Sequence, residues 1–155
     1  MAEPSESTPK LPVYSGAIVS GPEGQILCQL RDDKPDILFP GYWTCSPGGH
    51  VEEGEVPEKA ILRELREEFE IEVTDLQPLK KLIRKEGYAP GIYHSFTAKL
   101  VTPLHEVKCN EGQRVDFFQP HEIKNLRVHP VSLDFLETWL ANPKAATDKD
   151  TVCDG

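Results

Sequence analysis

The densest chemistry in the sequence is a run of glutamates between residues 52 and 70. Eight of the 26 acidic residues of the chain lie there. Three of them, Glu64, Glu67 and Glu68, are spaced i, i+3 and i+4, so in a helix their carboxylates share one side. Like charges at this spacing repel each other, and a hard divalent cation bound by oxygen ligands would offset that repulsion. The spacing therefore indicates a Mg²⁺ site, with Mn²⁺ as the alternative metal.

A solvated, charge-rich helix face is the alternative interpretation of the same run. Arg63 stands four residues before Glu67, an opposite-charge spacing that is typical of an exposed helix, and Arg66 and Glu70 repeat it. The segment 47–50 before the helix favours the metal, because its two adjacent glycines let the backbone approach a ligand closely. The Asp-x-Asp-x-Asp-Gly loop of an EF-hand does not occur in the sequence.

The segment from Gly49 to Ile71 resembles the signature of the Nudix hydrolases, G-x5-E-x7-R-E-U-x-E-E-x-G-U, in which U is aliphatic. The matching residues, at the same spacing, are Gly49, Glu55, Arg63, Glu64, Leu65, Glu67, Glu68 and Ile71. One fixed position differs, because Glu70 stands where the family has a glycine. That glycine usually ends the helix in a left-handed conformation, so Glu70 is expected either to cost about 1 kcal/mol there or to end the helix differently. It removes no carboxylate from the metal side.

The resemblance covers residues 13–141 and implies an α/β fold, the Nudix-type α/β/α sandwich in which a mixed β-sheet lies between helices. It implies a Mg²⁺-dependent hydrolase that cleaves the pyrophosphate bond of a nucleoside diphosphate linked to another moiety, X. A (d)NTP or an oxidised nucleotide is the leading substrate, because the chain is compact. A nucleotide sugar, a dinucleoside polyphosphate and a non-hydrolytic nucleotide-binding module remain alternatives, and an unrelated acidic interaction protein is a third reading.

The resemblance also implies roles for the residues of the signature. Glu67 and Glu68 would be the principal metal ligands, and Glu64 a further ligand or the general base. The carbonyl of Gly49 would complete part of the metal shell. Arg63 would act beside the carboxylates by holding one of them in place, Glu55 for example, as metal sites require of residues around their ligands.

Residues outside the signature are candidates for one further ligand and for substrate recognition. Glu111, before the last strand, stands where several relatives carry an additional carboxylate ligand, and a solvated loop glutamate is its alternative. Arg31 and Arg84 are candidates for phosphate contacts, although a surface arginine is more often only solvated. Tyr88 and Tyr93 are candidates for stacking on a base, although tyrosines at strand ends are more often packing residues.

Hydrophobic patterning predicts the elements that must position these residues. Strands are expected at 13–20, 25–31, 42–45, 71–73, 79–83, 92–101 and 114–118, and helices at 56–70 and 132–140. The first two strands read as a hairpin joined by the turn Gly21–Gly24. Ala60, Ile61, Leu65 and Phe69 recur at helical spacing and form the expected buried side of the acidic helix.

The length and composition of the chain limit its domain organisation, its partners and its location. The chain has 155 residues, which fits one domain, expected at 13–141 between a flexible N-terminal arm, 1–12, and a flexible C-terminal tail, 142–155. Its net charge of −9 argues against a nucleic-acid polymer as partner. No apolar run approaches a membrane span and no signal peptide is visible, so a cytoplasmic location is expected. The four cysteines have no disulfide or zinc spacing and are expected to be free thiols. A homodimer is left open, since relatives often dimerise.

Overall fold

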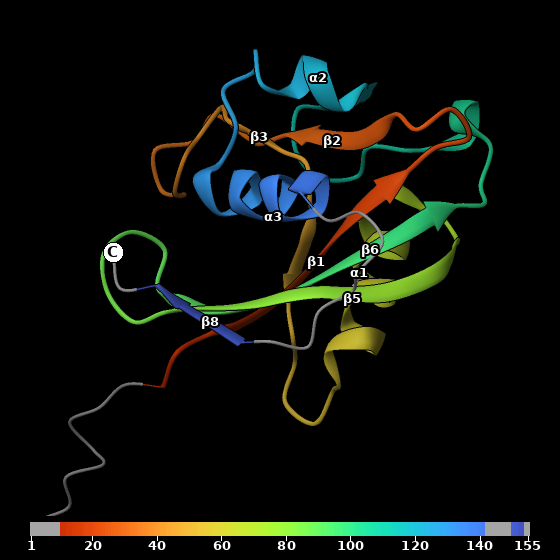
Figure 1. The fold of residues 1–155 in the computed structure, drawn as a ribbon. Coiled ribbons are helices and arrows are strands. Elements are labelled where there is room, and N and C mark those ends of the chain that lie inside the picture. The colour runs from red at the N-terminus through yellow and green to blue at the C-terminus, as the bar shows by residue number, and fades with distance from the viewer. Residues whose placement is uncertain (1–9, 142–149, 154–155) are drawn as a thin grey trace, which may run out of the picture.

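The computed structural model describes residues 10–141 and the backbone of residues 150–153. In this part of the chain an eight-stranded mixed β-sheet lies between helices (Figure 1). The strands are β1 Val13–Ser20, β2 Ile26–Leu30, β3 Trp43–Thr44, β4 Gly48–His50, β5 Val73–Arg84, β6 Gly91–Leu100, β7 Arg114–Phe118 and β8 Asp150–Cys153. The helices are α1 Pro57–Phe69, α2 Pro120–Ile123 and α3 Pro130–Ala141, with a 3-10 turn, η2, at Leu104–Glu106.

The sheet runs in the order β3-β2-β1-β6-β5-β8, with β4 added to β1 and β7 added to β2. Strands β1 and β6 pair in parallel along their whole length, whereas β5 and β6 are antiparallel. Helix α1 covers one face of this sheet and α3 the other (Figure 1). The expected α/β/α sandwich with a mixed sheet is therefore confirmed.

Alternation along β1 divides the core between the two faces. Ala17 and Val19 pack with the buried side of α1, whereas Ile18 between them packs with α3. All three are at most 1% exposed, which explains why the strand reads as a continuous apolar run. The strand that leads toward the site is thus fixed by apolar packing on both faces.

Helix α1 forms as the sequence predicts. It begins at Pro57, a residue whose missing N–H is not needed in the first turn. Its four expected core residues, Ala60, Ile61, Leu65 and Phe69, are at most 1% exposed. Glu70 ends the helix in the left-handed region, at φ 56° and ψ 44°, and its N–H donates to the carbonyl of Arg66. The backbone therefore adopts the conformation that suits the glycine of the family signature.

The expected hairpin of the first two strands is correct only at its turn. Ser20 and Ile26 are the one residue pair that joins β1 to β2. Below it the same edge of β1 pairs with β4, and Gly16 lies opposite Gly48. A Cβ on Gly48 would meet the backbone of Ser15, so this close approach requires glycine. A short strand without apolar residues gives no periodic signal, which is why β4 is absent from the predicted strands.

Two predicted strands, 71–73 and 79–83, are one strand, β5. The pairing of β5 with β6 shifts register between Thr74 and Gln77 and again between Pro78 and Lys80. Asp75, inside the first shift, has a positive φ of 55°. Bulges of this kind interrupt the alternation that the sequence analysis relied on, and they also accommodate the proline.

The C-terminal tail contains regular backbone where none was expected, because β8 pairs in parallel with β5. A short edge strand has too few residues for a periodic signal of its own. The rest of the tail, 142–149 and 154–155, and residues 1–9 of the arm lie outside the described residues. The domain limits therefore stay a prediction.

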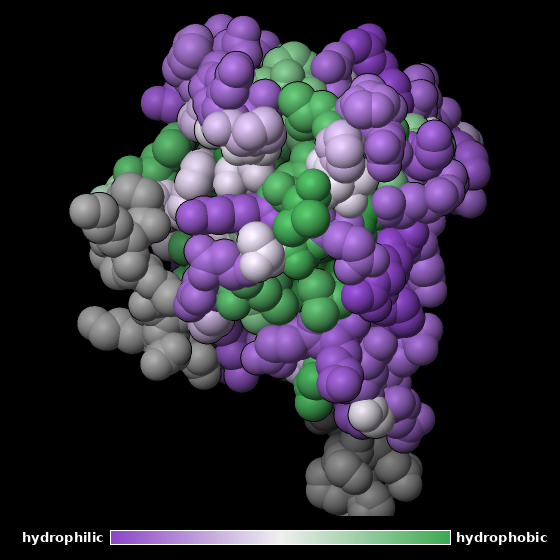
Figure 2. Space-filling model, turned by 90° about the vertical axis from the view of Figure 1, so that its right-hand side faces the viewer, coloured by the Kyte–Doolittle hydropathy of each residue, from purple (hydrophilic) through white to green (hydrophobic). Residues whose placement is uncertain are grey.

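On the side seen in Figure 2, apolar side chains gather near the middle and hydrophilic side chains surround them. Val101 and Leu104, after β6, are among the exposed large apolar residues. Within the described ranges, every helix is too short or too polar to cross a membrane. The three cysteines whose side chains are described, Cys28, Cys45 and Cys109, are free, as expected.

Candidate active site

The carboxylates of α1 differ in burial. The side chain of Glu67 is 59% exposed and that of Glu64 is 14% exposed, whereas Glu68 as a whole residue is only 4% exposed. Burial raises the pKa of Glu68 well above its ordinary value, and a hydrogen bond with Glu64 and the nearby charge of Glu111 add to the effect. The helix thus holds a buried acid among other acids, which is unfavourable for a charged group unless a cation compensates it.

Gly49 makes room for Glu64. A Cβ placed on Gly49 would lie 2.5 Å from Cδ and 2.6 Å from both carboxylate oxygens of Glu64. The carboxylate therefore lies directly against the backbone of β4, and only a residue without a side chain leaves it there. The hydroxyl of Ser15 donates to the carbonyl of Pro57 at 2.9 Å and fixes the start of α1 beside β4.

Arg63 joins the carboxylates to one another. Its Nε and Nη2 donate to the two oxygens of Glu55 at 2.8 and 2.9 Å, a bidentate pair. Its Nη1 donates to Glu64 at 3.0 Å and to Glu67 at 3.2 Å, and its Nη2 also reaches the carbonyl of His50 at 3.0 Å. Hydrogen bonding to Arg63 lowers the pKa of Glu55 to about 2. The structure thus brings Arg63 to Glu55, the carboxylate that the sequence analysis named.

The segment before β7 caps the end of α1. The N–H groups of Lys108 and Asn110 donate to the carbonyls of Phe69 and Glu68, both at 2.9 Å or less, and Nδ2 of Asn110 donates to the carbonyl of Glu67 at 2.9 Å. These bonds satisfy carbonyls that a helix end leaves open. They also place the next residue, Glu111, close enough to Glu68 to raise its pKa.

The chemistry of these donors fits a hard divalent cation. The side chains of Glu64, Glu67, Glu68 and Glu111 offer only oxygen, and β4 presents backbone beside them. Within residues 10–141, no three His, Cys, Asp or Glu side chains are gathered closely enough to hold a metal ion as they stand. Two of the four carboxylates are instead turned to Arg63.

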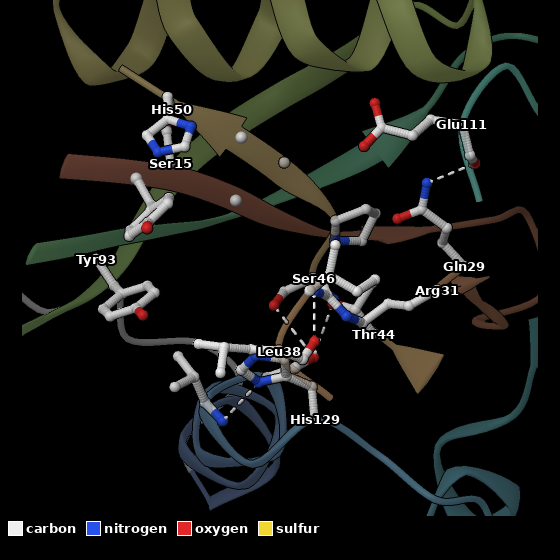
Figure 3. Close-up of a pocket in the computed structure, with 18 of the residues that line it drawn as sticks. Ser15, Gln29, Arg31, Leu38, Thr44, Ser46, His50, Tyr93, Glu111 and His129 are labelled. Atoms are coloured by element: carbon white, nitrogen blue, oxygen red, sulfur yellow. Dashed lines mark hydrogen bonds between the residues drawn. The ribbon is translucent and has the colours of Figure 1, made fainter. Parts of the chain in front are cut away.

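A cavity of about 540 Å³ opens beside this cluster. Gly49 and Glu111 belong to its lining, so the cavity and the acidic cluster meet at these two residues. Tyr14 lines it as well, and its ring stacks on Tyr93 at 4.9 Å and contacts His50 at 4.6 Å. In Figure 3, α1 passes along one end of the cavity and His129 lies at the other. This volume lies in the range of small-molecule sites.

The comparison with protein families decides what this arrangement is. The NUDIX domain matches residues 10–143 of the chain. The chain belongs to the Nudix family. Among solved structures, the NUDIX hydrolase from Nitrosomonas europaea has a TM-score of 0.77 at 22% identity, over 95% of this chain and 81% of that one. The ORF135 protein of E. coli has a TM-score of 0.66 at 24% identity, over 92% and 98%. At such identities the likeness shows the fold alone.

Curated relatives include the nucleoside triphosphatase NudI of Escherichia coli O17:K52:H18 (strain UMN026 / ExPEC). It is 40% identical over 95 residues, which make up 56% of this chain and 65% of that protein. NudI of E. coli strain SE11 is 39% identical over 97 residues, again 65% of the relative. The chain therefore spans less than two thirds of the length of these relatives.

The three candidate substrate residues lie in two places. Arg31 lines the cavity of the Nudix site, and its Nη2 and Nε donate to the carbonyls of Leu38 and Phe39 at 2.7 and 3.3 Å. Arg84 and Tyr88 are not part of the lining. The buried Arg84 lies against Tyr88 instead, with its guanidinium 3.8 Å from the centre of the ring. The structure therefore separates these two residues from the cavity.

Sequence reasoning missed Gln29, His129 and Ser132, which line the same cavity. Gln29 is 7% exposed, and its Nε2 donates to the carbonyl of Glu111 at 2.8 Å. The hydroxyl of Ser132 accepts the N–H of Cys45 at 2.8 Å. These residues belong to β2 and to the start of α3, far from the signature in sequence. A polar residue inside the otherwise apolar β2 was the one available signal for Gln29.

Proposed function

We propose that this chain is a Mg²⁺-dependent hydrolase that cleaves the pyrophosphate bond of a nucleoside triphosphate, with a dNTP or an oxidised nucleotide as the first candidate. The observation that carries the proposal is the junction at Gly49 and Glu111, where the acidic face of α1 meets a cavity with aromatic walls. Phosphates at the carboxylates and a nucleoside in the cavity would fit this arrangement. The name of the NudI relatives, nucleoside triphosphatase, supports the same class of substrate.

The chain's residues divide the work of the proposed reaction. Water attacks one phosphorus, and the bridging P–O bond breaks as a nucleoside monophosphate and a phosphate product separate. The metal, held by Glu67 and Glu68 with Glu64, the Gly49 carbonyl or Glu111, would neutralise phosphate charge and acidify the attacking water. Glu64, if it is not a ligand, accepts the proton of that water.

Arg63 acts on the carboxylates rather than on substrate in this proposal. Its bidentate pair with Glu55 fixes the guanidinium, which in turn holds Glu64. Glu67 accepts from Nη1 of Arg63 through Oε1, and this contact would not prevent its other carboxylate oxygen from binding the cation. The exposed position of Glu67 leaves it free to turn.

A product-release screen tests the function. The chain is incubated with Mg²⁺ or Mn²⁺ and a panel of NTPs, dNTPs, oxidised dNTPs, nucleotide sugars and dinucleoside polyphosphates, and the phosphate product is quantified. Metal-dependent release from a triphosphate is the expected result. Release from a nucleotide sugar or dinucleoside polyphosphate alone would replace the proposed substrate class. Absence of turnover throughout would favour a binding module.

The cytoplasmic location and the homodimer also remain predictions. The free state of the three described cysteines supports a reducing compartment. Size-exclusion chromatography with light scattering would measure the oligomeric state of the 17.4 kDa chain directly.

A further inference from the structure

His129 is held rigidly at the end of the cavity that is farthest from α1 (Figure 3). It precedes α3, and its carbonyl accepts the N–H of Leu133 at 2.9 Å. Nδ1 of its ring accepts the N–H of Val131 at 3.1 Å and so caps the helix. Its ring also contacts that of Phe39, with centroids 4.6 Å apart. The imidazole therefore has one orientation.

This hydrogen bond determines which ring nitrogen of His129 is the acceptor and which is the donor. Because Nδ1 accepts, the proton of the neutral imidazole lies on Nε2. Burial, with the nearby charge of Arg31, lowers the pKa of His129 to about 4, so the ring is neutral at physiological pH. Nε2 has no hydrogen-bond partner among the described residues and is not sealed from solvent. His129 lines the cavity, and the one donor that its ring leaves available is Nε2–H, which cannot act as an acceptor.

Other polar groups near this wall do not change that polarity. Arg31 is also donor-only, and its guanidinium is fixed by the carbonyls of Leu38 and Phe39. Asp36 also lines the cavity, but it is exposed and keeps its contact with water. Ser132 also lines the cavity, and its buried hydroxyl already accepts the N–H of Cys45. His129 thus offers an N–H group of fixed orientation on this wall.

The position of this donor matters because of the direction in which a nucleotide would lie. A nucleotide with its phosphates at α1 would extend its sugar and then its base into the cavity, with the base edge farthest from the sugar toward the end occupied by His129. That edge carries a carbonyl oxygen in guanine, thymine and uracil, but an amino group in adenine and cytosine. An amino group at that position would place its N–H groups against the N–H of His129, and neither group could accept a hydrogen bond from the other.

We infer that His129 is a specificity-determining residue, which selects nucleotides with a carbonyl oxygen at this edge over those with an amino group. The inference rests on the proposed function, because it takes the α1 end as the place of the phosphates. One neutral hydrogen bond lost on this wall corresponds to about a tenfold difference in kcat/KM.

The test compares kcat/KM for two substrate pairs, dGTP with dATP and dUTP with dCTP, in the wild type and in two variants. His129→Asp keeps an acceptor for the cap of α3 but has no N–H, whereas His129→Asn keeps both an acceptor and an amide donor. The wild type is expected to prefer dGTP and dUTP by about tenfold. The preference should vanish or invert in His129→Asp and keep its direction in His129→Asn.

A wild type without this preference, or a preference unchanged in His129→Asp, would overturn the inference. If no nucleotide is hydrolysed, the proposed function fails, and the inference is then tested by binding alone. Calorimetric titration of the wild type with dGMP and dAMP in Mg²⁺ should show tighter binding of dGMP. Equal affinity, or no binding of either, would count against the role of His129.

Discussion

Gly49, which has no Cβ, and the guanidinium of Arg63, which three carboxylates share, organise the acidic cluster. Gly49 leaves room for the carboxylate of Glu64, and Arg63 fixes that carboxylate together with Glu55 and Glu67. A lysine cannot replace this arginine, because it has no planar fork for a bidentate contact. The arrangement of donors around the metal ligands therefore depends on a single side chain.

Arg63→Lys is expected to lower metal-dependent turnover by about 10- to 100-fold, the usual effect of removing a group that orients metal ligands. Steady-state hydrolysis of the best substrate, over a range of Mg²⁺ concentrations, measures the effect. Arg66→Lys is the matched control, since Arg66 lies on the same helix and makes a similar bidentate pair with exposed Glu72, which follows the helix. Equal activity in the two variants would show that Arg63 does not organise the ligands.

At the scale of elements, α1 owes its position to its two ends. Ser15 ties its first turn to β1, and the segment around Asn110 satisfies its last carbonyls. At the second of these ends, Glu70 keeps a left-handed conformation in spite of its side chain. A glycine would adopt this conformation without steric strain, because it has no Cβ. With Glu70 the end of the helix therefore carries a conformational cost.

Glu70→Gly is expected to raise the free energy of unfolding by about 1 kcal/mol, because it removes the strain of the left-handed residue. Urea denaturation measures the change. Glu70 also accepts a hydrogen bond from Asn110 at 3.0 Å, and Glu70→Ala removes this bond while it keeps the Cβ. A gain in the alanine variant as large as that in the glycine variant would exclude backbone strain as the cause.

The cap of α3 predicts a pH dependence of stability. The folded pKa of His129 is about 4, below the ordinary value of 6.5, so between these values the unfolded chain binds a proton that the folded chain does not. The contribution of neutral His129 to the free energy of unfolding is therefore fully present above about pH 6.5 and decreases as the pH falls. From pH 7.5 to 5 the wild type should lose about 2 kcal/mol relative to His129→Asn. Parallel losses in the two proteins would contradict this assignment.

In the molecule as a whole, the site forms where segments that are distant in sequence approach each other closely at glycines. Gly16 and Gly48 bring β1 and β4 together, and this contact replaces most of the pairing expected between β1 and β2. Gly48→Ala would drive a methyl group into the backbone of Ser15, which cannot move without separating the strands.

Gly48→Ala should therefore lower the free energy of unfolding by more than about 2 kcal/mol. Gly24→Ala is the control, because no atom lies within 4 Å of its added Cβ and only its φ of 81° opposes alanine. The control should lose about 1 kcal/mol. Chemical denaturation compares the two variants, and similar losses would show that the β1–β4 contact is not tight.

The sequence was enough to predict α1 and its buried side, because helical periodicity, Pro57 and the signature all indicate the same helix. It sufficed for β7, whose predicted bounds are those observed. It failed for β4, where glycine pairing leaves no apolar pattern, and for the bulges of β5. The cavity could not be predicted, because Gln29 approaches it from β2 and His129 from the residue before α3. Hydrogen bonds to Glu111 and Val131 orient these two side chains.

The most direct measurement of the central claim compares Glu68→Gln with Glu58→Gln in Mg²⁺-dependent hydrolysis of a nucleoside triphosphate. Both substitutions replace one carboxyl group of α1 by an amide, but Glu68 is buried among the carboxylates whereas Glu58 is exposed in the first turn. Glu68→Gln should remain folded and lose at least about 100-fold in turnover, while Glu58→Gln should keep wild-type activity. A folded Glu68→Gln with near wild-type turnover would contradict the metal site proposed for α1.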